Sequence, residues 1–521
     1  LSEFTGADSL PLDRFLRTLD IHSSIGAALA SIDERSLRIL ESYSRGVSAF
    51  IETQKLPAEF SLTGHRPAPW TPEDSLYVFA MLNLGISYNV CEELNFLLLA
   101  NRVGYDRAAW LVPVYHDESL PFDEAGKLGE LPHEKLIASV SGGARTDKFH
   151  ASVLPGSTPA SNNWALSGRR TRSGRSIVAN DTHLVLYIPD SWMMMHLRCP
   201  GYDVAGVAVP GVPLVTLGFN GRVAWGATMV MADSQDVFLE KTRIANGKRQ
   251  YLYRGLWHPV TERKELIRIK GEKPVEVVLG RTRHGVLIDE ALAGIPFEVA
   301  APLQPLRLPD GHALALRWPL EDGAETFRGF YLLGRSRSVG EAREAMRKIK
   351  SIYLNIVYSD ADTIAWQVTG KYPVRRKGTG MLPSPGWTGD YDWTGWVPFE
   401  QQPYEINPRN GYVATANQRT VPRGFPRHLT ASWYSPARAG RIREFLDGAH
   451  GATREHSLGM QMDTLSPTAR VLQKMIGPGG AERAGIETAI GSWSDGRMAG
   501  RAREALAFLD HSAFDAVLSA G

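Results

Sequence analysis

The chain has 521 residues, of which 58 are basic and 56 acidic, so its formal net charge is +2. This near balance, without a long run of one sign, disfavours a protein that binds nucleic acid or an anionic membrane surface. The longest apolar run, around residues 96–100, is far shorter than the roughly 20 residues that a membrane span requires. We therefore expect no membrane span and a small molecule as the partner.

The length exceeds the usual size of a single core, which favours two to four domains or one large layered body. The two cysteines, Cys91 and Cys199, could form at most one disulfide, and the sequence leaves open whether they meet. No basic segment followed by an apolar one opens the chain, so no signal peptide is visible.

The first part of the chain has helical patterns. Apolar residues recur at helical spacing over 12–19 and over 40–51, which predicts two amphipathic helices. Thr71-Pro72-Glu73-Asp74 is a helix start, with a hydroxyl cap, a proline at the first helical position and acidic residues in the first turn. A mostly apolar, buried helix through Phe79–Leu99 should follow.

The pattern changes at Ser161. Periodicity fades from about 104 to 160, and a long stretch without structure inside a compact protein is often functional. Beyond Ser161 the chain consists of short β-branched and aromatic runs separated by turn residues. Asn220-Gly221, flanked by Val215–Phe219 and Arg222–Trp225, is a strong signal for a β-hairpin.

Cutting the Ala160–Ser161 bond would place a hydroxyl nucleophile and a free α-amine on one residue. An α-amine has a pKa near ~8, against ~10 for lysine, so it is partly neutral at neutral pH and can act as the general base. The chain has no G-x-S-x-G elbow, no H-E-x-x-H zinc helix and no phosphate-binding G-x-x-x-x-G-K-[ST] loop. These features favour the chemistry of an N-terminal nucleophile hydrolase over other hydrolases and nucleotide-binding proteins.

Several motifs in a fixed order carry a resemblance to a known family. They are Ser161-Asn162-Asn163-Trp164, Ala179-Asn180-Asp181-Thr182-His183, Pro210-Gly211-Val212-Pro213, Gly218-Phe219-Asn220-Gly221, Ala224-Trp225-Gly226-Ala227-Thr228, Thr415-Ala416-Asn417-Gln418-Arg419 and Ser435-Pro436-Ala437-Arg438. Together they resemble the penicillin amidase family, which includes penicillin, cephalosporin and acyl-homoserine lactone acylases. The resemblance extends from Leu1 to roughly residue 470.

The resemblance implies an α+β fold, a four-layer αββα sandwich with a mostly helical N-terminal part. It implies a self-cleaving precursor that yields two subunits, with 1–130 in the first subunit, 131–160 as a spacer and 161–521 in the second. It also implies that both ends of this chain are truncated relative to the family. A periplasmic or secreted location follows from the same resemblance.

The resemblance further assigns roles to five residues. Ser161 would be the nucleophile, while the side-chain amide of Asn417 and the backbone N–H of Met229 would donate hydrogen bonds to the oxyanion. Arg438 would orient the amine of the nucleophile or the substrate. His183 would lie beside the nucleophile, as in cephalosporin and acyl-homoserine lactone acylases.

A structural calcium ion is a further implication of the resemblance. Glu92, Asp233 and Asp236 match calcium-binding positions of penicillin acylases, and carboxylate oxygens suit Ca²⁺. The further aspartate of the family is missing, because this sequence has Arg427-His428-Leu429 at that place. The alternative is that these acids are solvated or salt-bridged. No organic cofactor is expected.

The expected function is an acylase that hydrolyses an amide through an acyl-enzyme on Ser161, with an apolar acyl group. The substrate could be a penicillin, a cephalosporin or an N-acyl-homoserine lactone, and no single residue decides among them. The alternative is a family member without activity that serves as a scaffold for a ligand or partner.

Overall fold

The computed structural model describes residues 1–87, 89–111, 115, 126–127, 129–131, 160–184, 188, 190–294, 308–477, 480–492, 494 and 496–508. Apart from Leu131 and Ala160, the expected spacer lies outside the described residues, so the boundaries expected for the three parts of the chain stay predictions. None of the helices within these ranges is long and apolar enough to cross a membrane.

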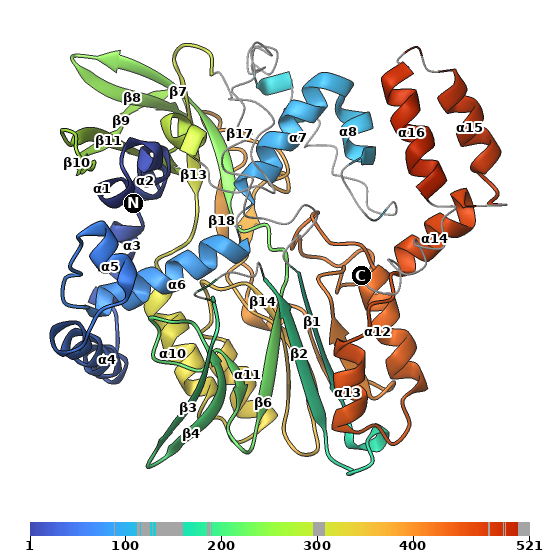
Figure 1. Cartoon of the computed structure of the whole chain (residues 1–521). Coiled ribbons are helices and arrows are strands. Elements are labelled where there is room, and N and C mark those ends of the chain that lie inside the picture. The colour runs from blue at the N-terminus through green and yellow to red at the C-terminus, as the bar shows by residue number, and fades with distance from the viewer. Residues whose placement is uncertain are drawn as a thin grey trace.

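The N-terminal part is helical, as expected (Figure 1). Its helices are α1 (Ser2–Thr5), α2 (Leu10–Thr18), α3 (Ile21–Ala30), α4 (Glu34–Thr53), α5 (Ala58–Thr63), α6 (Pro72–Ser87), α7 (Val90–Val103) and α8 (Tyr105–Leu111). The start of α6 is the predicted one, since the Asp74 carboxylate accepts hydrogen bonds from the backbone N–H and the hydroxyl of Thr71, both at 2.8 Å.

The prediction of one continuous helix in this part of the chain is wrong. The stretch Phe79–Leu99 forms parts of two helices, α6 and α7, which are separated near Asn89. The backbone N–H of Asn89 donates to the side chain of Gln235 at 3.0 Å, and the Asn89 side chain accepts from the Gln235 N–H at 3.2 Å. A continuous helix would bond the Asn89 backbone N–H to a carbonyl one turn earlier, but here it bonds to Gln235, so the apolar pattern does not extend as one helix.

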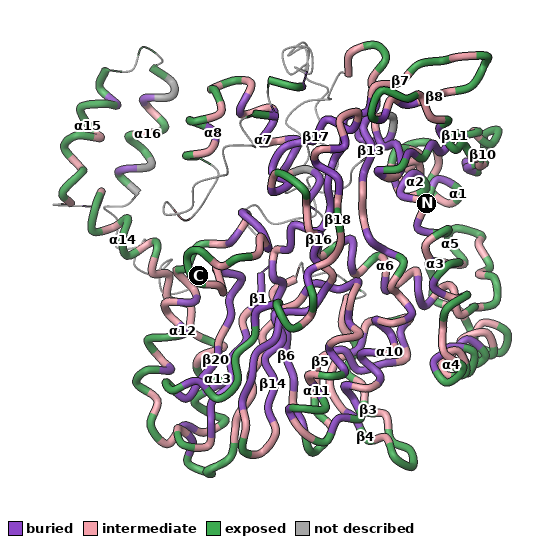
Figure 2. The backbone as a smooth tube through the Cα atoms, turned by 180° about the vertical axis from the view of Figure 1, so that it is seen from behind, coloured by how far each residue is buried: buried purple, intermediate pink, exposed green. Residues whose placement is uncertain are grey.

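Two antiparallel sheets face each other in the middle of the molecule. The smaller sheet has the order β2-β1-β20, with β1 (Ala160–Leu166), β2 (Ile177–His183) and β20 (Tyr412–Thr415). The larger has the order β19-β15-β14-β6-β5-β4-β3, with β3 (Met193–Cys199), β4 (Tyr202–Ala208), β5 (Leu217–Phe219), β6 (Ala224–Met229), β14 (Leu354–Ser359), β15 (Ile364–Val368) and β19 (Tyr404–Ile406). The central strands of both sheets are buried (Figure 2).

Alternation along β1 places one set of side chains on each side of its sheet. Trp164 and Leu166 pack in one cluster with Leu446 of α12 (Ala437–Gly448), on the outer side. Ala165 packs in another cluster with Val357 of β14, between the two sheets. The smaller sheet is therefore covered by helices on one face and by the larger sheet on the other.

Helices cover both outer faces, which makes four layers. Outside the smaller sheet lie α12 and α13 (Arg454–Gln461), and outside the larger lie α10 (Gly323–Leu333) and α11 (Val339–Met346) (Figure 1). The expected αββα arrangement is thus the one that the described residues form. The predicted hairpin is also confirmed, because β5 and β6 pair antiparallel around Asn220-Gly221, with Phe219 opposite Ala224.

A third sheet extends away from this sandwich toward the N-terminal helices. Its main order is β10-β11-β12-β13-β7-β8-β9, and β17 pairs with β7 in parallel. The strands are β7 (Asp236–Ala245), β8 (Lys248–Tyr253), β9 (Leu256–Pro259), β10 (Thr261–Ile267), β11 (Val275–Thr282), β12 (Gly285–Leu287), β13 (His312–Arg317) and β17 (Ser384–Pro385). The remaining elements are the ribbon of β16 (Pro373–Arg375) with β18 (Trp393–Trp396), and the helices α14 (Pro467–Ile476), α15 (Arg483–Gly491) and α16 (Gly496–Phe508).

Candidate active site

Ser161 lies near the start of β1, in the smaller sheet. It is buried and pairs across the strands with Thr182 of β2. Its backbone N–H donates to Asn417 Oδ1 at 2.9 Å, and its backbone carbonyl accepts from Arg438 Nη1 at 2.9 Å. Both partners come from segments more than 250 residues later in the chain, so the fold brings three of the expected site residues together.

Asn417 follows β20 and is fully buried. Its φ of 63° lies in the left-handed region, which asparagine tolerates better than most side chains. Oδ1 accepts from Ser161 and from Arg438 Nη2 at 3.0 Å, while Nδ2 donates to the carbonyl of Met229 at 2.8 Å. An amide nitrogen carries two hydrogens, and the second has no partner among the described residues. Asn417 therefore has one N–H available for an oxyanion.

Arg438 lies in the first turn of α12, on the outer side of the smaller sheet. Besides Ser161 and Asn417, it donates from Nη1 to the side-chain oxygen of Asn162 at 2.8 Å. Burial lowers the pKa of Arg438, and the group still carries its positive charge at neutral pH. The charge is held directly beside the main chain of Ser161.

Met229 ends β6, and its carbonyl accepts from the amides of Asn417 and Asn355, at 2.8 and 3.3 Å. The larger sheet therefore brings the backbone of Met229 to Asn417. The role expected for its N–H, as second donor to the oxyanion, stays a prediction.

His183 ends β2 opposite Ala160, the residue before the expected nucleophile. Its register partner is Ala160, so strand alternation turns its ring to the face opposite the Ser161 side chain. Nε2 lies 2.8 Å from Asp181 Oδ2 and 3.5 Å from the amide of Asn162. The structure thus brings His183 next to Ala160 and Asn162, and an interaction with the Ser161 hydroxyl stays a prediction.

Two asparagines in the sequence motifs connect the facing sheets, a role that the sequence analysis missed. Asn163 Nδ2 donates to the carbonyls of Gly226 and Asn355, at 3.3 and 3.0 Å. Asn180 Nδ2 donates to the carbonyls of Asn162 and Ala227, at 2.9 and 3.0 Å, and its Oδ1 accepts from the Ala227 N–H at 2.9 Å. The sequence signal for this role is an asparagine at a strand position where an apolar side chain is usual, because an amide placed between sheets must form hydrogen bonds there.

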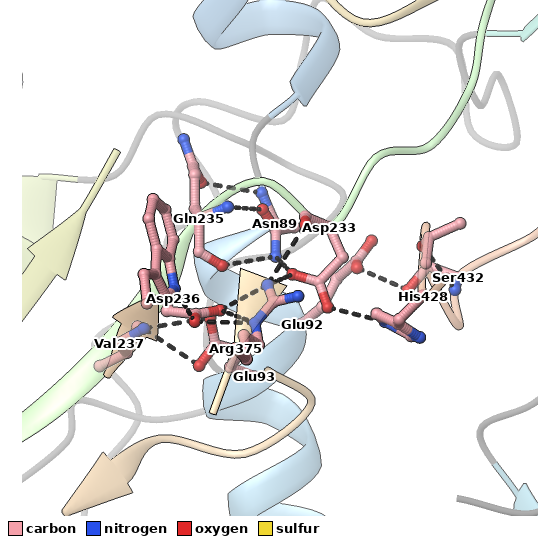
Figure 3. A network of polar contacts seen from close by, with 12 residues as sticks. Asn89, Glu92, Glu93, Asp233, Gln235, Asp236, Val237, Arg375, His428 and Ser432 are labelled. Atoms are coloured by element: carbon pink, nitrogen blue, oxygen red, sulfur yellow. Dashed lines mark hydrogen bonds and ion pairs between the residues drawn. The ribbon is translucent and has the colours of Figure 1, made fainter. Parts of the chain in front are cut away.

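The expected calcium ligands lie in one buried cluster but not around a common point (Figure 3). The Glu92 carboxylate accepts from the Ser432 hydroxyl, and burial raises the pKa of Glu92 to about 7. Asp233 and Asp236 instead share the guanidinium of Arg375, which the sequence analysis did not single out. Within the described part of the chain, no group of three or more histidine, cysteine or acidic side chains is arranged to hold a metal ion.

His428 lies in the stretch 427–429, where the resemblance implies a further aspartate that this sequence lacks. Its Nε2 lies 3.1 Å from Asp233 Oδ2, on the side of that carboxylate opposite to Arg375 (Figure 3). The side chains of Arg375 and His428 thus occupy the space beside Asp233 in which a calcium ion and its oxygen ligands would have to lie. As they are arranged, these residues do not fit the ion.

Cys199 is exposed and free. It is therefore not in the one disulfide that the sequence would allow, and the side chain of Cys91 lies outside the described part.

Comparison with known proteins agrees with the motif pattern. Residues 1–515 match the profile of the penicillin amidase family. The chain is 41% identical over its full length to an acyl-homoserine lactone acylase QuiP of Pseudomonas aeruginosa, covering 61% of that protein. It is 30% identical to a penicillin acylase 2 proenzyme of Pseudomonas sp. strain SE83, over 91% of this chain and 60% of that one.

This chain therefore spans about three fifths of the length of these curated relatives. A solved structure, a thermostable penicillin G acylase from Alcaligenes faecalis, is similar with 20% identity and a TM-score of 0.48. The similarity covers 66% of this chain and 58% of that one.

Proposed function

This chain belongs to the penicillin amidase family, and on that premise we propose that it is a self-processing acylase whose nucleophile is Ser161. The observation that carries the proposal is the pair of contacts on the Ser161 main chain, from Asn417 at 2.9 Å and from Arg438 at 2.9 Å. A serine held in this way keeps its place when the bond before it is cut.

Processing begins with the Ser161 hydroxyl, which attacks the carbonyl carbon of Ala160. The Ala160–Ser161 peptide bond breaks, an ester joins Ala160 to the Ser161 oxygen, and the Ser161 nitrogen becomes a free amine. Water then hydrolyses the ester and releases the hydroxyl. His183 is the cross-strand partner of Ala160, so it is placed beside this step.

The mature site uses the new amine as the general base for the Ser161 hydroxyl, directly or through a water. Asn417 Oδ1 accepts one N–H of this amine, and the nearby Arg438 charge disfavours its protonation. The remaining N–H of Asn417 and the N–H of Met229 donate to the oxyanion of the tetrahedral intermediate. The acyl group passes from the substrate nitrogen to the Ser161 oxygen, and the amine part of the substrate leaves. Water then hydrolyses the acyl ester, which releases the acid and regenerates the Ser161 hydroxyl.

The proposed substrate is an amide with an apolar acyl chain, with N-acyl-homoserine lactones as the first class to test. The support is the 41% identity to a protein named as an acyl-homoserine lactone acylase, against 30% to one named as a penicillin acylase. A periplasmic or secreted location is part of the same proposal. A scaffold without activity gains no support from the contacts described above.

The experiment is a panel of acylated amines that varies the acyl chain and the amine separately, with N-acyl-homoserine lactones, penicillins and cephalosporins. Release of the amine is measured for the wild type and for Ser161→Ala. The proposal predicts turnover of at least one acyl-homoserine lactone by the wild type and none by the variant. Equal rates for both proteins, or turnover of β-lactams alone, would contradict the assigned nucleophile or substrate class.

A further inference from the structure

Arg375, the last residue of β16, directs its guanidinium between two buried carboxylates (Figure 3). Nη2 donates to Asp233 Oδ1 at 2.9 Å and to Asp236 Oδ1 at 2.7 Å, and Nε donates to Asp236 Oδ2 at 2.8 Å. The backbone carbonyl of Asp233 also accepts from Nη2, at 3.2 Å. All three side chains are at most 5% exposed. The planar fork of donors of an arginine matches this set of oxygens.

The charges require such a cation. Asp233 and Asp236 are excluded from water and close to each other, so without a positive charge they would repel and lose their solvation. The neighbouring Glu93 accepts instead from the backbone N–H of Val237 at 3.1 Å.

The surroundings leave little space for an ion beside the guanidinium. Gly380 has a φ of 89°, and a Cβ there would lie 2.4 Å from Asp236 Oδ1 and 2.7 Å from Arg375 Nη2. The indole N–H of Trp393 donates to Asp236 Oδ2, which uses a further oxygen lone pair. Calcium needs six to eight oxygen ligands, and here nitrogen donors engage the oxygens of both aspartates.

We propose that Arg375 supplies the positive charge for which the family resemblance implies calcium, and that this protein folds and matures without the ion. The inference concerns the fold and does not depend on which substrate is hydrolysed. It differs from the expectation drawn from the sequence, in which Asp233 and Asp236 bind calcium and Arg375 has no role.

The cluster also connects distant segments with the site. Asn89, between α6 and α7, donates to Asp233 Oδ1 at 3.0 Å. The Asp233 N–H donates to the carbonyl of Leu429 at 2.8 Å, and Tyr434 N–H donates to the carbonyl of Asn417 at 3.0 Å. The segment 428–438, which leads to Arg438, is thus anchored on Asp233, through the backbone of Leu429 and the side chain of His428.

The test compares thermal unfolding in calcium and in the chelator EGTA, together with calcium titration calorimetry. The wild type should unfold at the same temperature in both buffers and bind no calcium. Arg375→Ala should unfold at a lower temperature in EGTA, and calcium should restore part of the difference, because the freed carboxylates then form an oxygen site. Arg375→Gln, which retains volume and supplies an amide oxygen, should respond to calcium in the same direction.

The matched control is Arg317→Ala. Arg317 lies at the end of β13, with its guanidinium 4.6 Å from the ring centroid of Trp393, and it makes no ion pair among the described residues. Arg317 is the cross-strand partner of Asp236 and acts on its charge, but its removal leaves the Arg375 guanidinium between the two aspartates. Calcium should therefore stabilise this variant less than it stabilises the Arg375 variants.

If the Arg375 variants do not stay folded, their refolding yields in calcium and in EGTA provide the same comparison. The proposal is overturned by a wild type that binds calcium or is destabilised by EGTA. It is equally overturned by Arg375 variants as stable as the wild type in EGTA, or by variants that calcium does not stabilise.

Discussion

Ser161 is held by its main chain and not by its hydroxyl. The N–H contacts Asn417 and the carbonyl contacts Arg438, whereas the hydroxyl makes no hydrogen bond within the described part of the chain. The hydroxyl oxygen is therefore available for the proposed attack, and the nitrogen that would become the amine is already positioned. In the proposed reaction, the main chain of Ser161 would therefore orient the residue, and its hydroxyl would make the attack.

Asn417 provides the sharpest test at this scale. Asn417→Ala should fold and lose roughly 10²–10³ in turnover, because it removes one N–H donor from the oxyanion. Asn417→Asp has the same shape and still accepts from Ser161 and Arg438, but it cannot donate. We expect kcat to fall similarly in both variants, measured on protein that has already matured.

The aspartate variant distinguishes donation from packing. If Asn417 acted through its shape alone, the isosteric aspartate would rescue turnover, so near wild-type turnover of Asn417→Asp would remove Asn417 from the oxyanion site.

At the scale of elements, the site depends on how closely the two sheets approach. Gly226 of β6 lies against Asn180 of β2, whose amide connects both sheets through Asn162 and Ala227. A Cβ at Gly226 would lie 2.6 Å from the Asn180 Cβ, which is closer than carbon atoms pack. Glycine at this position allows β6 to bring Met229 to Asn417.

Gly226→Ala should therefore lower the free energy of unfolding by about 1–3 kcal/mol, the usual cost of forcing extra volume into a packed core. Gly395→Ala is the control, since Gly395 is also in a strand and a Cβ there meets nothing within 4 Å. Urea unfolding of the two variants checks the expectation, and equal midpoints would contradict a close contact at Gly226.

The turn between β11 and β12 of the third sheet contains a buried histidine, His284, with two acidic neighbours. His284 Nδ1 lies 2.8 Å from Glu240 and Nε2 lies 3.0 Å from Asp392, while Phe238 stacks on the ring at 4.2 Å. Burial alone would lower the pKa of His284, but the hydrogen bonds to Asp392 and Glu240 outweigh burial and raise it. The folded protein thus binds the imidazole proton more tightly than the unfolded chain does.

The sign of the resulting pH dependence follows from linkage. The stabilisation from His284 is fully present below the unfolded pKa of about 6.5 and is lost as the pH rises through the higher folded value. His284→Gln cannot be charged, so its deficit in unfolding temperature relative to the wild type should shrink from about pH 6 to about pH 9. A deficit that is constant across this range would show that the imidazole is neutral in the folded protein.

The sequence predicted the local features well. The helix start at Thr71, the hairpin at Asn220-Gly221 and the change from helices to strands around Ser161 depend on neighbouring residues, and the structure has all three. Asn417 and Arg438 were found through motifs, since turn and helix-start patterns alone would not have distinguished them from surface residues.

The features that the sequence did not reveal depend on long-range partners. Arg375 contacts Asp233 and Asp236 from 142 and 139 residues away, and Asn89 interrupts a helix because of Gln235, 146 residues later. The face to which His183 turns is set by strand register, and a shift of one residue would reverse it. No local pattern contains this information.

At the scale of the whole molecule, one hydrophobic core extends on both sides of the Ala160–Ser161 bond. Phe79 of α6 contacts Phe327 and Phe330 of α10, with ring centroids 6.2 and 5.9 Å apart. The same core includes residues from Phe15 in α2 to Ala431 near the site. Cutting one peptide bond leaves this core intact, so the two pieces should stay associated in one folded protein.

The central claim is that Ser161 becomes the first residue of a new chain. It is tested most directly by intact mass and N-terminal sequencing of the purified wild type and of Ser161→Ala. We predict two fragments for the wild type, with the larger one beginning Ser-Asn-Asn-Trp, and one uncut chain for the variant. A wild type that stays whole, a new terminus at any other residue, or an equally cleaved Ser161→Ala would contradict the account.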